Sequence, residues 1–185
     1  GSHGVASTQH NSEQAITTLK EGLLISQKMG DRFSAAGSYG MMSIRNCYNG
    51  EFEIALDYAI KSLEIAESLN IERIRLFSTI TQLHSRLFLE SDIEPIQQDL
   101  KRIAPNGIDS LINRPSEAFA AIFTYLFMYA RLGDLQSLVA TFAYLPAILS
   151  FGMKYIEVVL PHIALWIAES DPDMAFIYLE YAQQH

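Results

Sequence analysis

The chain has 185 residues and a formal net charge of −8, and 49% of its residues are hydrophobic while only 18% are charged. This composition is too apolar for a disordered chain, so we expect it to fold. Residues 106–185 contain eight acidic residues and only three basic ones, Arg114, Arg131 and Lys154. Direct nucleic-acid binding is not expected there, because phosphate binding needs clustered Lys and Arg.

Cys47 is the only cysteine, which excludes an intramolecular disulfide and a thiolate metal cage. A reducing, cytoplasmic location fits this cysteine usage best. The first residues lack the charged and apolar regions of a signal peptide.

The first residues resemble a tag remnant. Gly1, Ser2 and His3 are typical of tag removal, and no apolar periodicity is present up to about residue 11. No initiating Met follows, which indicates a fragment of a larger protein. We therefore expect a disordered lead over 1–11 and a single helical repeat domain over 12–185.

One residue pattern occurs twice, with a displacement of 40 residues. A period near 40 with helical spacing predicts stacked helical hairpins, because one hairpin cannot bury its own apolar face. The paired positions are Ala15 and Ala55, Ile16 and Leu56, Leu19 and Ala59, Gly22 and Ser62, Leu23 and Leu63, Ser26 and Ala66, Met29 and Leu69, and Gly30 and Asn70.

In chain order, apolar spacing and helix breaks predict nine helices. Asn49-Gly50 is a typical helix stop, and acidic residues after Gly50, Ser91, Gly133 and Ser170 suit the start of the next helix. The predicted helices cover residues 12–29, 32–48, 51–69, 72–90, 93–104, 116–132, 135–150, 154–169 and 172–183.

Residues 104–115 interrupt this order with two prolines, a glycine and two asparagines. They predict a loop, and both a plain connection and a binding loop remain open.

The predicted helix over 72–90 carries an unusual number of polar residues. Ser and Thr are mediocre helix formers, so the cluster indicates either a strip facing a ligand or a solvated face. Arg75 lies on the same stripe as Ser78, Gln82 and Ser85. The polar residues are Ser78, Thr79, Thr81, Gln82, His84 and Ser85.

Gly50, Ala55 and Ser62 have the relative spacing of the glycine and two small residues of the tetratricopeptide repeat, which the chain resembles over residues 13–70. Ser43 and Asn46 depart from that pattern, since glycine and tyrosine are usual there. The period near 40 and the junction Lys28-Met29-Gly30-Asp31 resemble the long repeats of maltose-regulator-type transcription activators and related signalling ATPases.

The resemblance implies an all-α fold, a right-handed superhelical array of antiparallel helix hairpins (a tetratricopeptide-like α-solenoid). It also implies that the first helix of each hairpin lines a concave binding face. The residues expected on that face are Met41, Ile44, Tyr48, Arg75, Ser78, Gln82, Ser85, Phe123 and Phe127.

The sequence thus predicts a non-catalytic scaffold that binds a protein or peptide partner. The resemblance implies that this scaffold is a sensor or regulatory arm of a larger signalling or transcription-regulatory protein. We expect no enzyme activity, because no nucleophile–base pair and no phosphate-binding glycine loop is recognisable. No cofactor is expected. A metal site is not expected either, since His84 and His162 have no second ligand at helical spacing.

Two other functions remain open. One is an oligomerisation module, a homodimer through the apolar residues 135–168 that include Phe142, Tyr144 and Leu145. The other is a small-molecule sensor. A membrane span is not expected, because Pro146 and Gly152 interrupt the uncharged residues 135–153.

Overall fold

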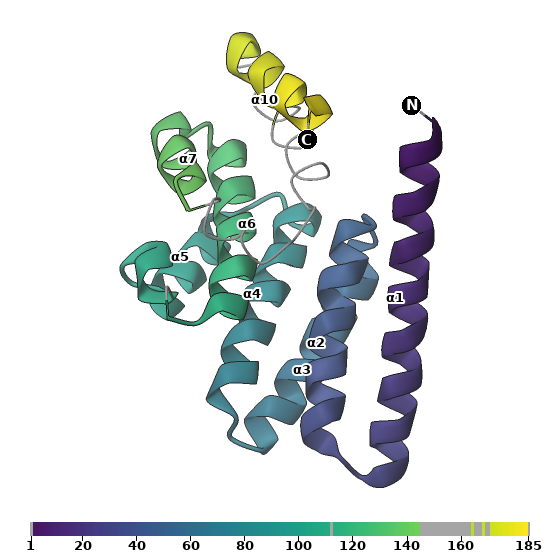
Figure 1. Cartoon of the computed structure of the whole chain (residues 1–185). Coiled ribbons are helices and arrows are strands. Elements are labelled where there is room, and N and C mark those ends of the chain that lie inside the picture. The colour runs from purple at the N-terminus through teal and green to yellow at the C-terminus, as the bar shows by residue number, and fades with distance from the viewer. Residues whose placement is uncertain (1, 112, 145–163, 165–167, 169–170, 185) are drawn as a thin grey trace. The chain divides into compact units, whose positions relative to one another are not determined.

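The computed structural model describes residues 2–111, 113–144, 164, 168 and 171–184, except for the side chains of 2–13, 48, 115, 174, 178 and 181–184. The described residues form helices and no strand, which confirms the predicted all-α class. They divide into two compact units, Gly1–Leu89 and Glu90–His185. Figure 1 shows both.

The first unit consists of α1 (Ser2–Met29), α2 (Arg32–Tyr48), α3 (Phe52–Ser68) and α4 (Glu72–Leu89). Helix α1 contacts α2, α2 contacts both α3 and α4, and α3 contacts α4 (Figure 1). The bounds of α2, α3 and α4 agree with the sequence prediction to within one residue at each end.

Helix α1 differs from the prediction because it already begins at Ser2, where a disordered lead is expected. Elongation of an existing helix adds one backbone hydrogen bond per residue and needs no apolar face. Residues such as Gln14 and Ala15 start a periodic segment from which the helix extends upstream.

The turns between these helices share one backbone geometry. Gly30, Gly50 and Asn70 have φ values of 68°, 78° and 53°, in the left-handed region. The residue after each donates its N–H to a carbonyl at the end of the preceding helix: Asp31 to Ser26, Glu51 to Asn46 and Ile71 to Ala66. This is the Schellman arrangement, and it reverses the chain within two residues.

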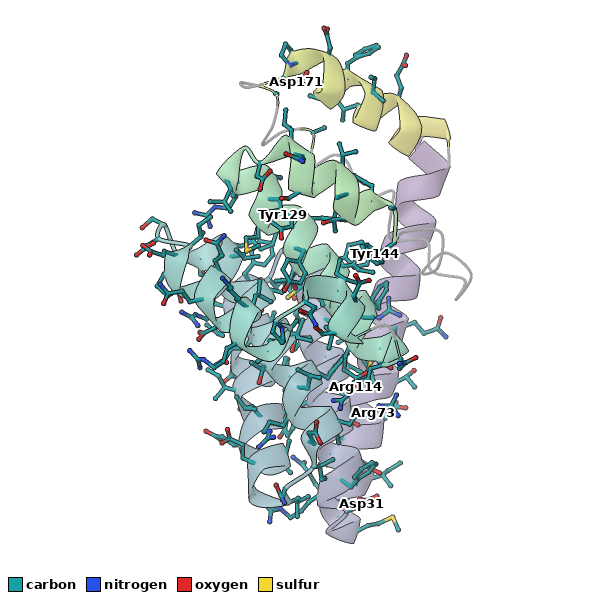
Figure 2. The ribbon with its side chains drawn as sticks, turned by 90° about the vertical axis from the view of Figure 1, so that its left-hand side faces the viewer. Asp31, Arg73, Arg114, Tyr129, Tyr144 and Asp171 are labelled. Atoms are coloured by element: carbon teal, nitrogen blue, oxygen red, sulfur yellow. The ribbon has the colours of Figure 1, made fainter. Side chains whose placement is uncertain are left out.

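Acidic side chains lie at the starts of the next helices, as the sequence predicts after Ser91 and Gly133; the same arrangement at Asp31 was not predicted. Asp31, labelled in Figure 2 at the turn after α1, accepts a hydrogen bond from the N–H of Ser34. Asp134 accepts one from Ser137, and Asp92 one from Glu94. Hydrogen bonds from the Ser34 side chain and then its backbone lower the pKa of Asp31. Glu51 makes no side-chain capping bond.

Small residues line α3 where it packs. Ala55, Ala59, Ser62 and Ala66 are buried and recur at steps of four, three and four residues, so they form one stripe of the helix. On α2, a Cβ on Gly40 would lie 3.0 Å from Cε1 of Phe77 and 3.3 Å from Oγ of Ser62. The small side chains allow the backbones of α2, α3 and α4 to approach closely.

The second unit contains α5 (Glu94–Ile103), the 3-10 helix η1 (Gly107–Leu111), α6 (Pro115–Leu132), α7 (Leu135–Phe142) and α10 (Pro172–Gln184). Helix α6 contacts η1 and α7. The predicted loop over 104–115 is therefore partly helical. It is anchored by the buried side chains of Ile108 and Leu111.

The prediction that a helix runs over 135–150 is wrong, because α7 ends at Phe142. A proline at position 146 has no N–H for the hydrogen bond to a residue four earlier, so the sequence disfavours a regular helix that continues through it. The helix predicted over 154–169 lies outside the described residues except for 164 and 168. Among the helices that are described, none combines the length and apolarity needed to cross a membrane.

Two glycines of α2 give a matched test of the close approach. Gly40→Ala should lower the free energy of unfolding by about 1 kcal/mol, because the new Cβ presses on Phe77 and Ser62. Gly37→Ala should raise it by about 0.5–1 kcal/mol, since a Cβ there meets no described atom within 4 Å and glycine disfavours the helix. Urea unfolding of both variants measures the difference, and equal effects would contradict the packing at Gly40.

Candidate functional site

The nine residues predicted for a concave binding face do not share one environment. Met41 and Arg75 are exposed, and Gln82 is half-buried. The side chain of Tyr48 lies outside the described residues. The other five are buried: Ile44, Ser78, Ser85, Phe123 and Phe127.

Ser78 uses its hydroxyl inside the first unit. The Ser62 hydroxyl donates to the backbone carbonyl of Ala36 at 2.7 Å, and the oxygens of Ser62 and Ser78 lie 2.7 Å apart. A hydroxyl has one proton, so Ser78 is the donor to Ser62. This chain of hydrogen bonds joins α4, α3 and α2.

Ser85 is engaged in a similar way about two helical turns further along the same stripe of α4. Its hydroxyl lies 3.2 Å from the Cys47 sulfur on α2 and 3.1 Å from the carbonyl of Thr81, to which it donates. Burial raises the pKa of Cys47 to about 11, and its hydrogen bond with Ser85 offsets part of that rise. The thiol is therefore protonated at neutral pH, and its role is in packing.

The polar strip on α4 is thus divided by its surroundings. Ser78, Thr81 and Ser85 are buried and bonded within the unit, while Arg75 is exposed and Gln82 half-buried beside them.

His84 lies on α4 among these residues and is buried. Its ring centroid is 5.5 Å from that of Phe88, with the rings tilted by 51°. Phe88 in turn stacks on Phe52 of α3 at 3.9 Å and 6°. Burial lowers the pKa of His84 to about 4, so the imidazole is neutral at pH 7 and serves as part of the core.

In the second unit, Phe123 and Phe127 belong to an aromatic core on α6. The rings of Phe119 and Phe123 meet edge to face at 4.8 Å. Tyr125 and Tyr129 stack at 5.8 Å, and burial raises the pKa of Tyr125 to about 12. Tyr129 and Tyr144 are labelled in Figure 2, and the Tyr144 hydroxyl donates to Asp109 at 2.8 Å.

Two contacts, one within each unit, were not expected from the sequence. Arg131 donates to the carbonyls of Glu90 and Ser91 at 2.9 and 3.0 Å, which fixes the start of the second unit to α6. Gly40 faces Phe77, and only the helix-interior position of this glycine is visible in the sequence.

The described residues contain no group of three or more His, Cys, Asp or Glu side chains placed to hold a metal ion. His162 lies outside the described residues. Comparison of the chain with protein-family models, curated proteins and solved structures finds no match.

The serine pair should show strong coupling. Ser62→Ala should cost about 1–3 kcal/mol of unfolding free energy, because it leaves the buried Ser78 hydroxyl without its acceptor. Ser78→Ala should cost about 1 kcal/mol, and the double variant should cost less than the sum by about 1 kcal/mol. Chemical unfolding of the full cycle measures this coupling. Ser68→Ala, at the exposed end of α3, is the control. If the losses of the two single variants Ser62→Ala and Ser78→Ala simply add up in the double variant, the direct bond between the two serines is contradicted.

His84 should make the first unit less stable in acid. Its folded pKa of about 4 lies below the unfolded value near 6.5, so the unfolded chain binds the proton more readily. The contribution of His84 to the free energy of unfolding is therefore fully present above about pH 6.5 and is lost as the pH drops toward 4. At pH 5 this loss amounts to about 2 kcal/mol. Unfolding at pH 7 and pH 5 measures the loss. His84→Gln should remove most of that difference, and an unchanged difference would contradict a buried neutral imidazole.

Proposed function

We propose that this chain is a non-catalytic scaffold that binds a protein or peptide. In this proposal its hairpins form a right-handed superhelical array like that of tetratricopeptide repeats, and the array is the sensor or regulatory arm of a larger cytoplasmic signalling or transcription-regulatory protein. Support for an array comes from the first unit, where the turns at Gly30 and Asn70 repeat one backbone geometry 40 residues apart.

The observation that carries the binding role is the exposure of large apolar side chains on α2. Met41 is 43% exposed and Phe33 is 60% exposed, both on the helix that contacts α1, α3 and α4. Exposed apolar groups on a rigid helix provide anchors for a partner, because their burial removes apolar surface from water without reordering the backbone. Methionine also adapts its shape to different partners.

Polar selectivity in this proposal comes from α4. Arg75 and Gln82 keep their side chains at least partly exposed, in contrast to the bonded serines beside them. A guanidinium and an amide can recognise carboxylate and backbone groups of a peptide. Because Ser78 and Ser85 already have internal partners, they contribute rigidity to α4 rather than contacts to a ligand.

Oligomerisation through residues 135–168 is the alternative proposal. Most of those residues lie outside the described part of the chain. Tyr144 already donates to Asp109 of its own unit. The exposed side chains of α2 therefore provide the more direct argument, and a small-molecule sensor would need an enclosed cavity.

Met41 gives a direct test of this surface. Peptides are selected on the intact chain from a random-sequence display library, and their affinities are measured for variants. Met41→Glu should weaken binding by at least about tenfold, because it places a charge where an apolar anchor is buried. Met41→Leu should preserve most of the affinity.

Ile54→Glu on α3 is the matched control, since Ile54 is 47% exposed in the same unit. It should leave binding unchanged. The proposed surface is wrong if Met41→Glu and Ile54→Glu have the same effect, or if no peptide that binds the parent chain can be selected.

A further inference from the structure

Helix α1 has one covered face and one open face. Ser26 is buried and Leu23 half-buried where α1 packs on α2. Ile25 and Met29, by contrast, are 58% and 77% exposed. Thr18 and Gly22 are exposed as well, and the four positions follow one another at steps of four, three and four residues. They form one stripe along the helix, here called the open stripe.

The internal repeat identifies the counterpart of this stripe. Residues of α1 correspond to residues of α3 at a displacement of 40, so Thr18, Gly22, Ile25 and Met29 correspond to Tyr58, Ser62, Ile65 and Leu69. The structures at the helix ends agree with this pairing. Gly30 and Asn70 are both left-handed, and the bond from Asp31 to Ser26 matches the bond from Ile71 to Ala66.

On α3 the middle of the corresponding stripe is covered, at Ser62 by both α2 and α4, while its last residue, Leu69, is 38% exposed. The Ser62 hydroxyl donates to the carbonyl of Ala36, and the Tyr58 ring stacks on Tyr39 at 6.0 Å. Ser62 is fully buried, whereas its counterpart Gly22 is exposed and a Cβ there would meet no described atom within 4 Å. Since α2 follows α1 as α4 follows α3, no helix of the first unit takes on α1 the position that α2 takes on α3.

We propose that the open stripe is the binding surface for an amphipathic helix that packs on α1 as α2 packs on α3. The repeat determines the direction and register of that helix: it lies antiparallel to α1, with the counterpart of Ala36 opposite Gly22. Small residues favour this mode, because they let two helix backbones approach. This inference concerns a different surface from Met41 and does not depend on the proposed function.

Two differences between α1 and α3 specify the chemistry of the partner. Gly22 has no side chain where α3 has Ser62, so a large apolar residue of the partner fits where α2 presents Ala36. Lys28 replaces Ser68, to which the Arg32 guanidinium donates at 2.6 Å. A partner arginine would be repelled by Lys28, so the first turn of the partner helix should carry a carboxylate.

A grafted helix tests this proposal. A second copy of residues 32–51, with Arg32→Glu and Ala36→Leu, is placed directly before Ser12 in place of residues 1–11, so that the turn at 49–51 leads into α1 in the register of the repeat. Under reducing conditions this chain should melt at least about 4 °C higher than the parent. Amide hydrogen exchange over residues 18–29 should slow at least about tenfold.

Ile25→Asp in the grafted chain should remove both gains, while the same change in the parent should have little effect because Ile25 is exposed. Ile60→Asp, at an exposed position of α3, is the matched control and should leave the gains intact. If the graft prevents folding, the same segment is added to the parent as a synthetic peptide, and exchange over residues 18–29 is measured. Slower exchange that Ile25→Asp abolishes supports the proposal.

Two results would overturn it. In one, the added helix forms in the grafted chain, yet its melting temperature and its hydrogen exchange over residues 18–29 equal those of the parent. The same conclusion holds if the synthetic peptide changes neither the melting temperature nor the exchange of the parent chain. In the other, the parent chain sediments as a dimer that Ile25→Asp dissociates, which assigns the open stripe to a second copy of the chain.

Discussion

The close approach of α2 to α3 and α4 is the constraint on which the first unit depends. Gly40 leaves room for the Phe77 ring, and Ser62 is near enough to the α2 backbone to donate to the Ala36 carbonyl. Ala55, Ala59 and Ala66 keep the rest of the α3 stripe equally small. Small residues bury little apolar area each, so backbone proximity and the serine hydrogen bonds compensate for what larger side chains would contribute.

The turns determine where that approach occurs. Each chain reversal in the first unit uses a left-handed residue and a bond back to the preceding helix, so the next helix starts antiparallel and in a fixed register. Asn70 accepts this conformation although it carries a side chain, since Asn is among the few residues that tolerate it. The same geometry at Gly133, followed by the Asp134 cap, starts α7 in the second unit.

Local rules explain why the helix bounds could be predicted and much of the site could not. Asn49-Gly50 and Asp31 act within a few residues, so sequence alone locates those ends. The sequence predicts a kink or a helix end at Pro146, because proline lacks a backbone donor, but the predicted helix bounds follow the apolar periodicity to residue 150, whereas α7 ends at Phe142. The start of α1 at Ser2 has no such marker.

The environment of the predicted site residues depends on partners distant in sequence. The buried Ser78 bonds with Ser62, and the buried Ser85 with Cys47; neither pairing follows from the spacing of polar residues on one helix. Arg75, Ser78, Gln82 and Ser85 form a continuous stripe by periodicity, but that stripe crosses the edge of the buried face. Phe123 lies in the aromatic core of α6, and aromatic content alone does not separate core from surface.

The contrast between α1 and α3 connects this packing rule to function. A glycine inside a helix costs about 1 kcal/mol relative to alanine, so Gly22 weakens α1 as Gly37 weakens α2. At Gly40 the space left by the missing side chain is filled by Phe77, and at Ser62 the small side chain meets the α2 backbone. At Gly22 the described structure provides no such neighbour, although Ile25 and Met29 flank it with exposed apolar surface. The rule that explains the interior of the first unit therefore also identifies the outer face of α1 as a place where a helix binds.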